Sequence, residues 1–170
     1  MVYHKYSELD LIEYIDYGGT TSQVAPMVSA TAALMITINE CLTASEVNQI
    51  LKLTSKDVES LFLNHKFAGN IGAGSLQIDK AVEFSNEIKK TNGNAIIKDH
   101  LFKRWDFEIK NINNNLQIKN VQFTHNTSAH FIARKSITIE ENTLLEPGPS
   151  LGSSKSILLE IDSTINTSCH

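Results

Sequence analysis

Hydrophobic positions follow two different periods along the chain, and the change falls near residue 94. Up to residue 90, apolar residues recur at helical spacing, while behind residue 94 they alternate with polar ones. A turn-rich segment at residues 91–94 separates the two patterns. The pattern therefore predicts a helical part at residues 1–94 and a strand-rich domain at residues 95–170.

The first predicted helix covers residues 24–38 and is apolar or small on all sides. Such a pattern predicts a helix enclosed by protein. Thr20, Thr21 and Ser22 are residue types that cap helices, so the helix is expected to begin close to Ser22, with Pro26 in about its first turn. At about 15 residues it is too short to cross a bilayer.

Two amphipathic helices are predicted next. Thr43 and Glu46 form a capping-box signature before a helix that ends near Leu53. Residues 54–75 read as a loop with a short strand, and residues 78–90 as a helix whose apolar stripe contains Ile78, Ala81, Val82, Ser85 and Ile88.

The strand-rich domain is expected to be a small antiparallel sandwich or barrel-like module. Val121 and Phe123 are out of step with Leu116 and Ile118, which predicts a bulge near Asn120. The six predicted strands cover residues 95–102, 105–110, 116–124, 128–134, 136–140 and 156–162.

The sequence motif around Ser22 is similar to a motif of a known protein family. The order Thr-Ser-x-x-x-Pro, followed by Val and small residues, resembles the nucleophile segment of subtilisin-like serine proteases. Thr20 departs from that pattern, because the family has Gly there, and Val24 departs from the usual Ala. The matching positions are Thr21, Ser22, Pro26, Val28, Ser29 and Ala30.

A second string, residues 68–82, is similar to the Gly-x-Gly-x-(Leu/Ile) segment that leads into the closing helix of the subtilisin-like domain. The resemblance covers about residues 18–90. It implies an α/β fold, of which residues 1–94 would be the mainly helical C-terminal portion, followed by the antiparallel all-β domain at residues 95–170.

The resemblance assigns Ser22 as the catalytic nucleophile, with Thr21, Thr20 and Gly19 supporting the oxyanion site and the turn. A hydroxyl at a helix start is favourably placed, since the Ser22 N–H then lies near the oxyanion that forms. The simpler alternative is that Ser22 is only a helix cap.

The other members of the catalytic triad have no candidate in this chain. In the family the order is Asp, His, Ser, with the first two far upstream, and His4, Asp10 and Asp16 are too close to Ser22. The upstream part of the catalytic domain is therefore required, and this chain is expected to be inactive alone. Without that part, the helix at residues 24–38 should leave an exposed apolar patch.

The amino-acid composition limits the classes of protein to which this chain can belong. The chain has 170 residues, a net charge of −4 and 41% hydrophobic residues, which fits one or two soluble domains. No basic run indicates nucleic acid, Cys41 and Cys169 indicate neither a zinc site nor a disulfide framework, and no secretion signal is visible. Surface or loop positions are expected for the six histidines, His4, His65, His100, His125, His130 and His170.

Two functions remain open. The first is a secreted or cell-surface serine endopeptidase that acts on peptide or protein substrates through an acyl-enzyme on Ser22. It would need no cofactor from these residues, although calcium, frequent in the family, is possible in the complete protein. The alternative is a non-catalytic protease remnant whose β module has a surface-binding or structural role.

Overall fold

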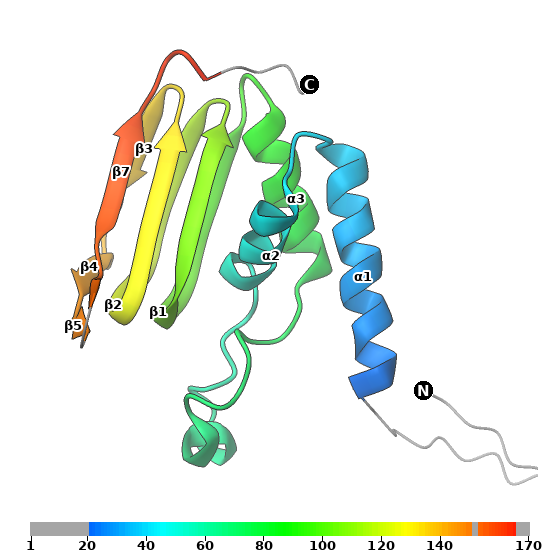
Figure 1. Cartoon of the computed structure of the whole chain (residues 1–170), viewed down its shortest axis with the longest axis vertical. Helices are drawn as coiled ribbons and strands as arrows, with labels where there is room; N and C mark the ends of the chain where they lie inside the picture. The colour runs from blue at the N-terminus through cyan, green and yellow to red at the C-terminus, as the bar shows by residue number, and fades with distance from the viewer. Residues whose placement is uncertain (1–20, 151–152, 166–170) are drawn as a thin grey trace, which may run out of the picture.

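The computed structural model describes residues 21–150 and 153–165 (Figure 1). Three α-helices lie on one side of a β unit, and a short 3-10 helix, η1, projects from the loop between the second and third helix. The helices are α1 (Thr21–Ile38), α2 (Ala44–Leu53), η1 (Phe62–Phe67) and α3 (Ile78–Lys89). The strands are β1 (Asn94–Ile112), β2 (Asn115–Ala133), β3 (Ser136–Ile139), β4 (Leu144–Pro147), β5 (Pro149–Ser150), β6 (Ser153–Ser154) and β7 (Ile157–Ile161).

The capping box predicted before α2 is confirmed. The Thr43 hydroxyl accepts a hydrogen bond from the Glu46 N–H at 3.2 Å, and the Glu46 carboxylate accepts one from the Thr43 N–H at 3.0 Å. These bonds satisfy two of the donors that a helix start leaves open. The helix then buries Val47, Ile50 and Leu53 on one face.

The predicted α3 is also confirmed, within one residue at its end. Ala81, Ser85 and Ile88 of the expected stripe are buried, whereas Val82 is partly buried and Ile78, in the first turn, is 37% exposed. Between α2 and α3 the expected short strand is reduced to a single antiparallel bridge between Lys56 and Ser75.

The β unit is parallel, which corrects the antiparallel sandwich expected from the sequence. β1 pairs with β2 in parallel, and β3, β4 and β7 each pair in parallel with successive parts of β2. Within the described residues, antiparallel pairing is confined to the short β5–β6 pair and the bridge at Lys56. The fold is thus α/β with a sheet dominated by parallel pairs.

The register shows how so short a connection can join parallel strands. Asn94 pairs with Asn115, which pairs with Ser136, so in this part of the ladder each position lies beside the one 21 residues later. From Arg104 to Ile109 the offset is 22 residues. A straight strand of 19 residues would extend about 60 Å, yet only two residues separate β1 from β2. Each long strand must therefore bend back on itself, so that residues 94–114, 115–135 and 136–162 form the first, second and third coil of a stack.

The bends lie at residues with a left-handed backbone. Asp99 has φ of 57° and Asn120 has φ of 49°, and the Asn120 side chain donates to the Asp99 carboxylate at 2.9 Å. The bulge predicted near Asn120 is wrong, because Lys98 pairs with Lys119 and His100 with Val121 in an unshifted register, and the register shifts instead between Phe102 and Arg104. The position is a bend that recurs in consecutive coils. Asn and Asp tolerate this conformation because their short side chains bond locally.

The interior of the stack consists of ladders of like residues. Phe102 lies beside Phe123 with ring centroids 5.1 Å apart, and Phe131 continues the aromatic cluster 6.1 Å from Phe123. All three rings are at most 1% exposed. Because Ile50 and Phe84 belong to the same hydrophobic cluster, the helices and the first coil share one core.

Candidate functional site

Ser22 lies in the first turn of α1, which begins at Thr21, so the predicted helix start is correct within one residue. The Ser22 side chain is exposed. Gly19 and Thr20, which were expected to support the turn, lie outside the described residues. The structure thus places the proposed nucleophile on an accessible helix start, where backbone N–H groups favour negative charge.

Pro26 is the sixth residue of α1, one turn further in than the sequence predicts. In a regular α-helix the N–H of residue 26 would bond to the carbonyl of Ser22. Proline has no N–H, so the Ser22 carbonyl lacks this intrahelical donor. The backbone at the candidate nucleophile is therefore less constrained than in the middle of a helix.

α1 is buried on one side only. Thr31 and Met35 are fully buried, and just after the helix the Asn39 amide donates to the Ser85 carbonyl of α3 at 3.1 Å. Val24 and Met27 in the first half are 50% and 51% exposed, and Leu34 and Ile36 in the second half are 50% and 45% exposed. A helix enclosed on all sides is therefore not what this chain forms, and the apolar patch expected in the absence of a cover is confirmed.

No triad partner contacts Ser22 within residues 21–150 and 153–165. Of the four described histidines and the described carboxylates, none forms a hydrogen bond with the Ser22 hydroxyl. His65 bonds to the Ser60 carbonyl, and His130 lies between Glu160 at 3.4 Å and Glu108 at 3.8 Å. Ser22 therefore lacks a general base in the described part of the chain.

The glycine-rich string has a structural role that can be read from Gly74. Its φ is +142°, and a Cβ built there would lie 2.3 Å from the Lys56 carbonyl oxygen. The close approach permits the bridge in which Lys56 and Ser75 exchange two hydrogen bonds of 2.9 Å. Only glycine fits both the space and the backbone conformation.

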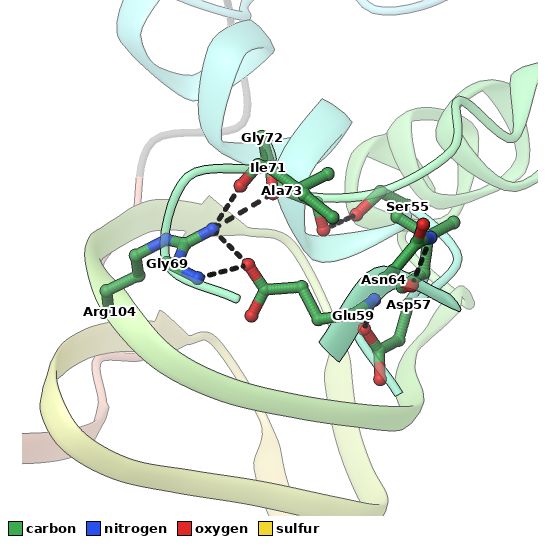
Figure 2. A network of polar contacts seen from close by, with 10 residues as sticks. Ser55, Asp57, Glu59, Asn64, Gly69, Ile71, Gly72, Ala73 and Arg104 are labelled. Carbon is green, nitrogen blue, oxygen red and sulfur yellow. Dashed lines mark hydrogen bonds and ion pairs between the residues drawn. The ribbon is translucent and has the colours of Figure 1, made fainter. Parts of the chain in front are cut away.

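Arg104, in the first coil, forms hydrogen bonds with the loop between α2 and α3 (Figure 2). Its guanidinium donates to the Glu59 carboxylate at 2.6 Å, and to the carbonyls of Ile71 and of Gly72, the latter at 3.2 Å. Glu59 also accepts the Gly69 N–H at 3.0 Å. Sequence reasoning missed this cluster, because an isolated Arg in an alternating segment carries no signal about its partner.

His100 is buried, which corrects the expectation of a surface position. Its ring stacks on Phe102 with centroids 4.0 Å apart, and its residue exposure is 8%. Burial lowers the pKa of His100, while Asp57 and Glu59 oppose this shift through their negative charge. The imidazole is therefore neutral near pH 7.

One nitrogen of this ring lacks a hydrogen-bond partner. Within the described residues, His100 Nδ1 is buried without a hydrogen-bond partner. It lines a hollow of about 20 Å³ together with Asp57 and Glu59, enough for one water molecule. A larger cavity of about 380 Å³, lined by the same two carboxylates, His65 and Lys103, adjoins the loop. His4 and His170 lie outside the described residues.

The described residues contain no group of three or more His, Cys, Asp or Glu side chains that could hold a metal ion. Among them, none of the helices combines the length and the apolar character that a membrane span requires. In searches of the whole chain against family models, curated proteins and solved structures, nothing matches.

Proposed function

We propose that this chain carries the nucleophile segment of a subtilisin-like serine endopeptidase, with Ser22 as the residue that forms the acyl-enzyme. The observation that carries the proposal is the position of Ser22, exposed in the first turn of α1 and followed by an uncovered apolar surface at Val24, Met27 and Val28. A catalytic serine needs an accessible hydroxyl, and an apolar helix needs a cover. Both requirements are met if an upstream part of the catalytic domain packs here.

In this mechanism the Ser22 Oγ attacks the scissile carbonyl, and a histidine from outside the described residues takes its proton. The Ser22 N–H stabilises the oxyanion, a contribution of about 10²–10³ in rate for one such donor, as measured in subtilisin itself. Removal of the base costs roughly 10⁶ in turnover, a figure also measured in subtilisin. Residues 1–170 alone are therefore proposed to show no measurable proteolysis.

The proposed location of the parent protein is extracellular or at the cell surface. Cys41, which follows α1, is disulfide-bonded, which corrects the expectation that the cysteines form no disulfide. Disulfides persist mainly in oxidising compartments, so this bond supports export. The proposed substrates are peptides or proteins, and no cofactor is proposed for these residues.

The experiment is a peptidase assay on the protein extended upstream by the rest of its catalytic domain. Ser22→Ala should lower turnover by about 10⁶-fold. Ser29→Ala is the matched control, because Ser29 is exposed on the same helix and its hydroxyl only bonds back to the Ala25 carbonyl at 3.2 Å. Equal activity of the two variants, in proteins with unchanged melting temperatures, would reject the proposal.

A second candidate is a non-catalytic remnant in which the β coils have a structural or surface-binding role. The stack of parallel coils favours this second function. The coils share a core with α2 and α3, and Ser22 is not part of that core. Retention of the full chain on cell-wall or polysaccharide preparations, unchanged by Ser22→Ala, together with an upstream sequence that lacks the triad His or Asp, would support this function over peptidase activity.

A further inference from the structure

Two adjoining spaces lie beside the loop between α2 and α3, and they differ in size. The smaller is a hollow of about 20 Å³ lined by His100, Asp57 and Lys103 among others, with room for one small polar group. The larger is a cavity of about 380 Å³ that shares Asp57 and Lys103 with the hollow. Pockets that bind small molecules enclose about 300–1,000 Å³, so the two spaces together have the dimensions of a small-molecule site.

The His100 ring presents a hydrogen-bond acceptor to the hollow. The residue is 8% exposed, and within the described residues its Nδ1 is buried without a partner. Burial lowers the pKa of His100, and a hydrogen bond to the Ser55 backbone opposes this shift. A bond that favours the protonated ring is one that a ring N–H donates to a carbonyl. Because Nδ1 has no partner, Nε2 is that donor, and Nδ1 of the neutral ring can only accept.

Two opposite charges face the same space without pairing. The Glu59 carboxylate points to the Arg104 guanidinium, 2.6 Å away (Figure 2). Asp57 accepts the Glu59 N–H at 2.8 Å, but within the part of the chain that the structure describes its carboxylate forms no ion pair. The Lys103 ammonium forms none there either. One negative and one positive charge therefore remain open at the walls of the two spaces.

We propose that the hollow and the larger cavity form one binding site for a zwitterion, namely a free α-amino acid. Its ammonium enters the hollow and donates to His100 Nδ1 and to the Asp57 carboxylate, and its carboxylate pairs with Lys103. A ligand that is only a cation would leave Lys103 unpaired. One that is only an anion would leave Asp57 unpaired and bring no donor to His100 Nδ1.

The remaining walls favour an apolar side chain on this amino acid. Ala68 and Leu101 line the larger cavity. The His65 ring, also at this wall, is already engaged with the Ser60 carbonyl at 3.0 Å. L-Leucine is therefore the probe, and the inference does not depend on the peptidase proposal.

The test is titration calorimetry of the full chain with three matched ligands. L-Leucine carries both charges, L-leucinamide lacks the carboxylate, and N-acetyl-L-leucine lacks the ammonium. Leucine should bind roughly tenfold or more tightly than either analogue, because each analogue loses one charged hydrogen-bond contact. In ¹⁵N NMR spectra the Nδ1 signal of His100 should shift when leucine binds, because this nitrogen then accepts a hydrogen bond.

Two variants test the charged groups of the site. Asp57→Asn removes the charge and keeps an oxygen for the Glu59 N–H, and Lys103→Gln removes the opposite charge. Each should weaken leucine binding by roughly tenfold or more. Lys110→Gln is the matched control, because Lys110 lies on the same strand and pairs with Glu108 at 2.6 Å, away from both spaces. Circular dichroism verifies that the variants are folded.

Four results would overturn the inference. Leucine that fails to bind at any concentration up to its solubility would show that the two spaces hold water only. Leucinamide that binds as tightly as leucine would assign the site to a simple ammonium, such as a peptide N-terminus. An unmoved Nδ1 signal, or leucine affinity that is the same in Asp57→Asn, Lys103→Gln and Lys110→Gln, would place the ligand elsewhere on the chain.

Discussion

The first two β coils and α1 are both rich in apolar residues, yet the coils bury their large aromatic side chains whereas one side of α1 is exposed. Phe102, Phe123 and Phe131 are at most 1% exposed, whereas Val24 and Met27 are half exposed. The strands find their partners 21 to 28 residues further along the chain, so each coil supplies the surface that covers its neighbour. The exposed side of α1 has no such neighbour among the described residues. This difference supports the proposal that α1 is completed from elsewhere.

The largest expected effect is in the core of the coils. Phe123→Ala should destabilise the chain by about 3–5 kcal/mol, because the ring is fully buried and lies against three other rings. Val28→Ala, at a 37% exposed position of α1, should cost less than about 1 kcal/mol in the same denaturant titration. Similar losses for both variants would show that α1 is covered in the isolated chain.

A smaller effect is expected in the loop that joins the helices to the coils. Gly74→Ala should cost about 1–3 kcal/mol, since the residue combines a positive φ with a close carbonyl contact. Gly72→Ala is the matched control two residues earlier, where a Cβ meets nothing within 4 Å. Thermal melting of both variants measures the difference, and equal melting temperatures would contradict the role assigned to Gly74.

The smallest effect concerns acidity. Burial lowers the pKa of His100 in the folded state, so between that pKa and the unfolded value near 6.5 the unfolded chain binds more protons. Stability should therefore fall as the pH drops below about 6.5. His100→Gln should weaken this dependence, and His65→Gln, at an exposed ring, should not. An unchanged pH profile for His100→Gln would contradict a buried neutral imidazole.

Local features could be predicted from the sequence because their partners are a few residues apart. The capping box of Thr43 and Glu46 and the buried stripe of α3 depend on spacings of three and four residues. Parallel pairing could not be inferred from alternation, which is the same in parallel and antiparallel strands. A usable signal was present nevertheless: Ala95, Leu116 and Ile137 repeat at 21 residues, as do Phe102 and Phe123.

The candidate site was predictable only in part. The position of Ser22 at a helix start followed from residue types, whereas the burial of His100 and the Arg104 cluster depend on contacts with residues more than 30 positions away in the sequence. In a strand, His100 and Phe102 point to the same face, because they are two residues apart. The alternation of the strand could therefore have indicated that His100 is buried beside Phe102. The exposure of α1 depends on which surface packs against this helix, and the sequence pattern of the helix does not identify that surface.

The most direct test of the proposed peptidase is to extend the chain upstream by the proposed remainder of a catalytic domain, to treat the protein with a fluorophosphonate probe and to identify the labelled residue by mass spectrometry. We expect label on Ser22 and none on Ser29, and no label on residues 1–170 alone. A folded extended protein that remains unlabelled, or that is labelled at another serine, would contradict it.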